Sequence, residues 1–85
     1  MEYLVVAFRV RAQTIAFSVL LKDNGVYNEI VNTPKEAGVG CGLSVKISQS
    51  QLYIVKRALG AGAFNSFAGI FKVKISGGGR SVKSI

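Results

Sequence analysis

The apolar residues of this chain change period along the sequence, and this change constrains the fold more than any other feature. Residues 2–8 are rich in β-branched and aromatic side chains, which predicts a strand buried on both faces. Residues 11–24 carry apolar side chains at helical spacing, and Asn24-Gly25 predicts the end of that helix, because glycine accepts the left-handed conformation found there. A second, more polar strand is predicted over residues 26–31.

The second half of the chain repeats this alternation. Residues 43–48 alternate between apolar and polar, as in a half-buried strand. Ser48 and Gln51 have the spacing of a helix capping box, and apolar residues then recur at helical spacing as far as Gly60. Residues 68–75 predict a last strand.

This order of elements predicts an α+β fold of the ferredoxin-like βαββαβ type, in which two helices cover one face of a four-stranded antiparallel sheet. The first and third strands are neighbours in that topology. The end of the first strand, the start of the first helix and the loop between the second and third strands then share one edge. We therefore expect Arg9, Arg11 and Cys41 to lie at the same edge of the sheet.

The length of 85 residues allows one domain. We expect residues 1–75 to form it and residues 76–85, which are rich in glycine and basic residues, to be a flexible basic tail. One cysteine and no histidine exclude an internal disulfide and a Cys/His zinc site, so we expect no metal and no cofactor. No signal peptide or membrane-spanning run is visible, which favours the cytoplasm, and a homodimer is left open.

The net charge of +7 has two interpretations. The charge belongs either to a basic surface that is simply solvated or to one that attracts an anionic partner, such as RNA or an acidic protein surface. Lys46, Lys72 and Lys74 are expected to share the open face of the sheet, where RNA-binding modules of similar architecture stack bases on aromatic side chains. The third predicted strand lacks such an aromatic pattern, so nucleic-acid binding is the less favoured interpretation.

Cys41 is the one candidate nucleophile. It lies in the segment Gly38-Val39-Gly40-Cys41-Gly42, where the backbone N–H groups of Gly40 and Gly42 can approach a bound atom closely. The segment leads into a strand and matches no phosphate-binding motif. The alternative is that Cys41 packs as a small buried hydrophobe, as free cysteines usually do.

Positive potential near the thiol would favour its thiolate, the reactive form. The first predicted helix has no obvious capping residue, so its first N–H groups and the flanking Arg9 and Arg11 form a candidate anion site, with Lys35 as a third cation. Solvated arginines are the alternative. The four carboxylates are scattered and histidine is absent, so no catalytic triad can form. A carrier thiol needs no base of its own, so a non-catalytic carrier or binding protein is favoured over an enzyme.

The loop resembles a known family. Thr33-Pro34-Lys35-Glu36, followed by Cys41-Gly42-Leu43, is similar to the T-P-R-E and C-G-L or C-G-I motifs of the selenium/sulfur carrier-like small domains. These occur alone or fused behind a TusA/SirA-like sulfur-transfer domain, and the resemblance covers nearly the whole chain. It departs from the family at Lys35, which replaces an arginine, and at residues 38–40, which replace a serine-rich stretch.

The resemblance implies that Cys41 is the carrier thiol. It would hold a persulfide or selenium atom, stabilised by Arg9, Arg11, Lys35 and the loop N–H groups. The atom would pass between donor and acceptor proteins, with a cysteine desulfurase as an example of a donor. The second hypothesis is a basic binding module for RNA or an acidic protein surface, with no redox role for Cys41.

Overall fold

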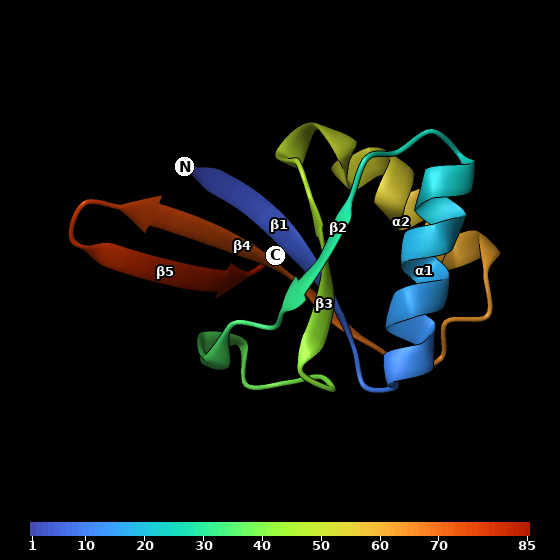
Figure 1. Cartoon of the computed structure of the whole chain (residues 1–85), viewed down its shortest axis with the longest axis horizontal. Coiled ribbons are helices and arrows are strands. Elements are labelled where there is room, and N and C mark those ends of the chain that lie inside the picture. The colour runs from blue at the N-terminus through green and yellow to red at the C-terminus, as the bar shows by residue number, and fades with distance from the viewer.

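The computed structural model describes all 85 residues, and its strands form a single antiparallel sheet in the order β2-β3-β1-β4-β5 (Figure 1). Two helices lie to one side of the sheet, and two short 3₁₀ helices, η1 and η2, flank β3. In chain order, the elements are β1 (Glu2–Phe8), α1 (Arg11–Asp23), β2 (Glu29–Asn32), η1 (Lys35–Ala37), β3 (Leu43–Ile47), η2 (Gln49–Gln51), α2 (Leu52–Ala61), β4 (Phe67–Ser76) and β5 (Gly79–Ser84).

The central strand β1 is buried on both faces, as its composition predicted. Its alternate residues Leu4, Val6 and Phe8 face the helices, where they join a core of ten buried residues that includes Phe17 of α1 and Val55 of α2. Side chains of successive strand residues point to opposite faces. Tyr3, Val5 and Ala7 therefore face away from the helices, whereas Glu2 lies on the same side as Leu4. β1 also pairs with β3, which confirms that the first and third strands are neighbours.

The face of the sheet away from the helices has a small core of its own. Val5 and Ala7 of β1 pack there with Phe71 and Val73 of β4. Partly buried side chains from the β2–β3 loop and from β5 cover this cluster. This face of the sheet is therefore partly covered, by Ala37 and Val39 of the loop and by Val82 of β5.

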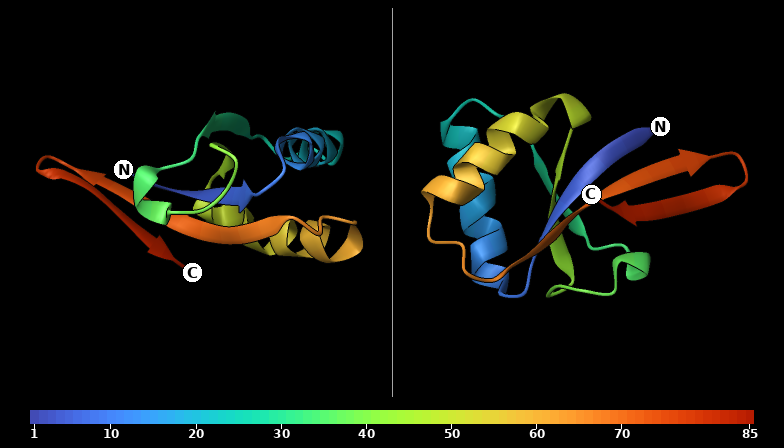
Figure 2. Two further views of the ribbon diagram at one scale, coloured as in Figure 1. Left: turned by 90° about the horizontal axis from the view of Figure 1, so that it is seen from below. Right: turned by 180° about the vertical axis from the view of Figure 1, so that it is seen from behind.

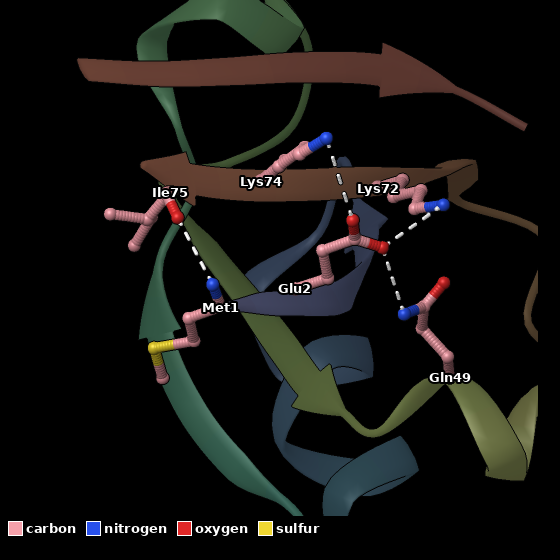
Figure 3. A network of polar contacts seen from close by, with 6 residues as sticks. All are labelled: Met1, Glu2, Gln49, Lys72, Lys74 and Ile75. Atoms are coloured by element: carbon pink, nitrogen blue, oxygen red, sulfur yellow. Dashed lines mark hydrogen bonds and ion pairs between the residues drawn. The ribbon is translucent and has the colours of Figure 1, made fainter. Parts of the chain in front are cut away.

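The expectation that three lysines share this face is wrong. Lys46 does lie on it, with its Nζ 4.5 Å from the centre of the Tyr3 ring. Lys72 and Lys74 alternate along β4 with the residues of the small core, so they point to the opposite side. There their ammonium groups lie 3.2 and 3.9 Å from the carboxylate of Glu2 (Figure 3).

The sheet has five strands, so the prediction of four was wrong. Residues 76–85, expected to be a flexible tail, include β5, which pairs with β4 in a hairpin that projects beyond the body of the protein (Figure 2). The physical reason is packing across the hairpin: Val82 lies opposite Val73 and contributes to the small core. The assignment to the ferredoxin-like folds and the 1–75 domain boundary stay predictions. Neither helix combines the length and apolar character needed to cross a bilayer.

Candidate functional site

Residues 33–42 form the loop between β2 and β3, which we call the Cys41 loop. Its base is closed by two contacts of Thr33: the N–H donates to the carbonyl of Gly42 at 2.9 Å, and Oγ1 lies 2.7 Å from Oγ of Ser44. Pro34 is buried and precedes η1 with a φ of −57°. The two motif residues Thr33 and Pro34 therefore fix where the loop leaves the sheet; any role beyond that stays a prediction.

Gly40 lets the Cys41 loop run against the end of β1. Its φ is +96°, and a Cβ at this position would lie 3.2 Å from the carbonyl oxygen of Phe8 and 3.7 Å from Cβ of Ala7. The next residue then donates its N–H to that same carbonyl: Cys41 N–H to Phe8 O is 3.0 Å. A glycine is required here because an L side chain would meet both backbone strain and a backbone atom. Cys41 is thereby fastened to the central strand.

The thiol of Cys41 is half-buried and belongs to neither apolar cluster. Its Sγ lies 3.7 Å from Oγ1 of Thr14 and 3.7 Å from the carbonyl oxygen of Leu43. Thr14, in the first turn and a half of α1, is fully buried and also donates to Leu43 O at 3.4 Å. A hydroxyl this close can donate to a thiolate, the stronger acceptor. The end of β1, the start of α1 and the Cys41 loop thus meet at Cys41, as the topology predicted.

The sequence patterns did not indicate Thr14 as a site residue. The signal that could have found it is a polar residue on the buried face of α1, which also carries Phe17, Ser18 and Leu21. That spacing places Thr14 toward the sheet, but it does not reveal that Cys41 lies opposite.

The start of α1 lacks a side-chain cap, as predicted. Val10 occupies the N-cap position and no acidic residue lies in the first turn. The N–H groups of Arg9 and Val10 donate to the backbone oxygen and to Oγ of Ser66, at 2.8 and 3.3 Å. Those of Arg11 and Ala12 have no partner in the structure. The positive end of the helix dipole is therefore open at the edge where Cys41 lies.

The three cations predicted to surround the thiol lie close to this edge in sequence, but no hydrogen bond joins their charged groups to the thiol. Arg9, Arg11 and Lys35 are exposed, and none makes an ion pair or a side-chain hydrogen bond. Gly40 and Gly42 are exposed, each with a φ of +96°. The role of these five residues in stabilising an anion stays a prediction.

A bidentate ion pair ties the Cys41 loop to β5. The guanidinium of Arg80 donates to the Glu36 carboxylate through Nη2 at 2.7 Å and through Nε at 3.0 Å. Hydrogen bonding from Arg80 holds the pKa of Glu36 below its ordinary value. The pair joins residues 44 apart in sequence, so no local pattern could have predicted it.

Nowhere does the fold gather three His, Cys, Asp or Glu side chains as a metal ion would require. The chain therefore offers one thiol, a buried hydroxyl beside it and an uncapped helix end, and little else that could do chemistry at this edge.

A comparison with protein families bears on this arrangement. The family model described as "Putative Se/S carrier protein-like" matches residues 3–68, which include the whole Cys41 loop. The chain belongs to this family. The resemblance read from the loop motifs is thus confirmed, and the family match ends early in β4, before β5. No curated protein and no solved structure matches the chain.

Proposed function

We propose that the protein carries sulfur or selenium on Cys41 and passes it between partner proteins. Membership of a carrier-like family supports the class of function. The observation that carries the assignment to Cys41 is its setting: the only thiol of the chain is half-buried at the start of α1, 3.7 Å from the buried hydroxyl of Thr14. A cysteine serving only as a core hydrophobe would lie within one of the two apolar clusters.

Loading is a nucleophilic exchange. The Cys41 thiolate attacks the terminal sulfur of a persulfide on a donor protein, a new S–S bond forms at Cys41, and the donor cysteine leaves as a thiolate. An acceptor thiolate attacks the same terminal sulfur in the reverse sense and releases Cys41. A terminal selenium atom follows the same balance. No oxidant or reductant is consumed, because the S–S bond that forms replaces the one that breaks.

Groups of this chain stabilise the negative charge on sulfur during this exchange. The Thr14 hydroxyl can turn its one proton from Leu43 O to the sulfur 3.7 Å away, and the unpartnered N–H groups of Arg11 and Ala12 are further donors at the same edge. Arg9, Arg11 and Lys35 are exposed cations near the same edge in sequence, and we infer that they supply positive charge to a persulfide anion held on Cys41.

No side chain placed to act as a base lies beside Cys41. Glu36 is engaged by Arg80, and the chain has no histidine. A carrier has no need of one, because the donor and acceptor can supply the proton transfers. We infer that the partners are sulfur or selenium donor and acceptor proteins, such as a cysteine desulfurase, and that the protein is a carrier and not an independent catalyst.

The alternative of an RNA-binding sheet face is less well supported. Stacking of bases needs exposed aromatic rings on that face. Phe71 is only 8 % exposed, and the Cys41 loop and β5 cover the cluster to which it belongs. Tyr3 lies beneath Lys46.

Intact-mass spectrometry tests the proposal after the protein is incubated with a cysteine desulfurase and cysteine. Wild-type protein should gain the mass of one sulfur atom, lost again on reduction. Cys41→Ser should gain nothing, and Thr14→Val, which keeps the thiol but removes the adjacent hydroxyl, should load more slowly. Absence of the adduct on wild type, or an equal adduct on Cys41→Ser, would contradict the proposal.

A further inference from the structure

β5 is the last strand of the sheet, and its outer edge makes no backbone hydrogen bond. Ile85 N–H donates to Ile70 O at 3.0 Å, so the ladder between β4 and β5 includes this residue pair. In an antiparallel ladder, hydrogen-bonded and non-hydrogen-bonded pairs alternate. Arg80, Val82 and Ser84 therefore direct their N–H and C=O groups away from β4. These three residues present a row of backbone donors and acceptors that can pair with another strand.

One face of the same hairpin is strongly basic. A pocket of about 170 Å³ is lined without any apolar residue by Glu2, Lys72, Lys74, Ser81 and Lys83. Lys72 lies directly opposite Lys83 in the β4–β5 ladder. Like charges in this position destabilise a sheet.

A single carboxylate faces these three ammonium groups. Glu2 binds Lys72 and Lys74 and also accepts a hydrogen bond from Gln49 at 3.1 Å (Figure 3). Lys83 has no carboxylate within 4.0 Å. The pocket thus keeps a net positive charge, and Lys83, on the edge strand itself, is the cation left for a further anion.

We propose that the free edge of β5 and the lysine pocket together form a docking surface for an extended acidic segment of a partner protein. The segment adds to the sheet as a sixth strand, with its backbone paired to Arg80, Val82 and Ser84. Its side chains alternate between the two faces, so Asp or Glu at every second position lies on the same face as Lys83. The backbone pairing supplies a general affinity, and the lysine pocket selects acidic sequences.

The same features disfavour other occupants. A second copy pairing through its own β5 would place another hairpin that carries Lys72, Lys74 and Lys83, and hence the same positive charge, beside this one. RNA cannot complete a ladder of backbone N–H and C=O groups, and no aromatic side chain lines the pocket for base stacking. The surface also lies outside residues 3–68 of the family match and does not include Cys41, so it stands independently of the carrier proposal.

Fluorescence anisotropy on the full chain, with a labelled peptide of alternating Glu and Thr, tests this proposal. The peptide should bind, more weakly as salt is added, and a Lys–Thr peptide should not. Lys83→Glu should weaken binding about tenfold, which corresponds to about 1.4 kcal/mol. Lys56→Glu, the same charge change on the exposed surface of α2, should leave the affinity nearly unchanged. Cys41→Ser should bind as wild type does.

Backbone pairing is tested separately from charge. The Glu–Thr peptide N-methylated at alternate residues should lose binding, because it can no longer donate to the edge of β5. Ser84→Pro should weaken binding relative to Ser84→Ala, which keeps the N–H. No binding of the Glu–Thr peptide, or equal binding after N-methylation, would overturn the proposal. Tighter binding of single-stranded oligouridine, or self-association through β5, would overturn it in favour of RNA or of a second copy.

Discussion

Replacing Gly40 with alanine tests how the Cys41 loop is held. Gly40 and Gly42 have the same φ of +96°, so alanine at either position incurs the same kind of backbone strain, about 1–2 kcal/mol. They differ in space: a Cβ at Gly40 lies 3.2 Å from Phe8 O, whereas a Cβ at Gly42 meets nothing within 4 Å. Gly42→Ala is therefore a matched control for Gly40→Ala.

The extra cost at Gly40 comes from the hydrogen bond beside it. The loop must move by a few tenths of an ångström to relieve the contact, and this strains the 3.0 Å bond from Cys41 N–H to the same carbonyl. Such a bond contributes about 0.5–1.5 kcal/mol. We expect Gly42→Ala to lower the free energy of unfolding by about 1–2 kcal/mol and Gly40→Ala by about 1.5–3.5 kcal/mol.

Urea denaturation followed by circular dichroism measures both values under one set of conditions. The rate of Cys41 alkylation should also change more in Gly40→Ala, because the shift that relieves the contact moves Cys41 relative to Thr14. Equal stability losses in the two variants would show that the loop does not press against β1, and the account of how the thiol is positioned would be refuted.

Three further substitutions test the core, the loop and the thiol. Phe17→Ala should cost about 3–5 kcal/mol in unfolding free energy, because Phe17 is fully buried and packs on the rings of Phe8 and Phe64 at 5.3 and 5.0 Å; a loss below about 1 kcal/mol in calorimetry would contradict this packing. Hydrogen bonding from Arg80 lowers the pKa of Glu36 in the fold, so the stability difference between wild type and Glu36→Gln should be present above the ordinary value of 4.5 and vanish as the pH falls through the lower, folded pKa. Denaturant titrations at several pH values measure this stability difference, and a difference that grows as the pH falls would contradict the lowered pKa of Glu36. Thr14→Val should slow the alkylation of Cys41 and lower the free energy of unfolding by at most about 1 kcal/mol. An unchanged alkylation rate would show that Thr14 has no part in the site.

Sequence patterns predicted the parts of this fold that depend on local periodicity. The continuous apolar run of β1 indicated burial on both faces, and the order of elements indicated that β1 and β3 pair, which placed Cys41 at the start of α1. The alternation along β4 placed Phe71 and Val73 on one face of the strand and Lys72 and Lys74 on the other. Periodicity shows only which residues share a face, and it does not show which face the helices cover. Lys72 and Lys74 were therefore assigned to the wrong face of the sheet.

The remaining features depend on contacts between distant segments. β5 has one inward apolar residue, Val82, whose partner Val73 is known only once the hairpin forms. The Glu36–Arg80 pair and the contact of Thr14 with Cys41 join segments 44 and 27 residues apart, and no local spacing encodes either one. The motif identified the thiol and its family, whereas the groups around the thiol required the structure.

Release of sulfur from Cys41 is the most direct test of the carrier account. Protein loaded with radiolabelled sulfur from a desulfurase, then freed of donor, is mixed with an excess of a low-molecular-weight thiol. If Cys41 is a carrier thiol, the label moves to the acceptor thiol and the intact mass returns to that of the unmodified chain, with no label ever bound to Cys41→Ser. Label that stays on the protein, or that Cys41→Ser binds equally well, would contradict it.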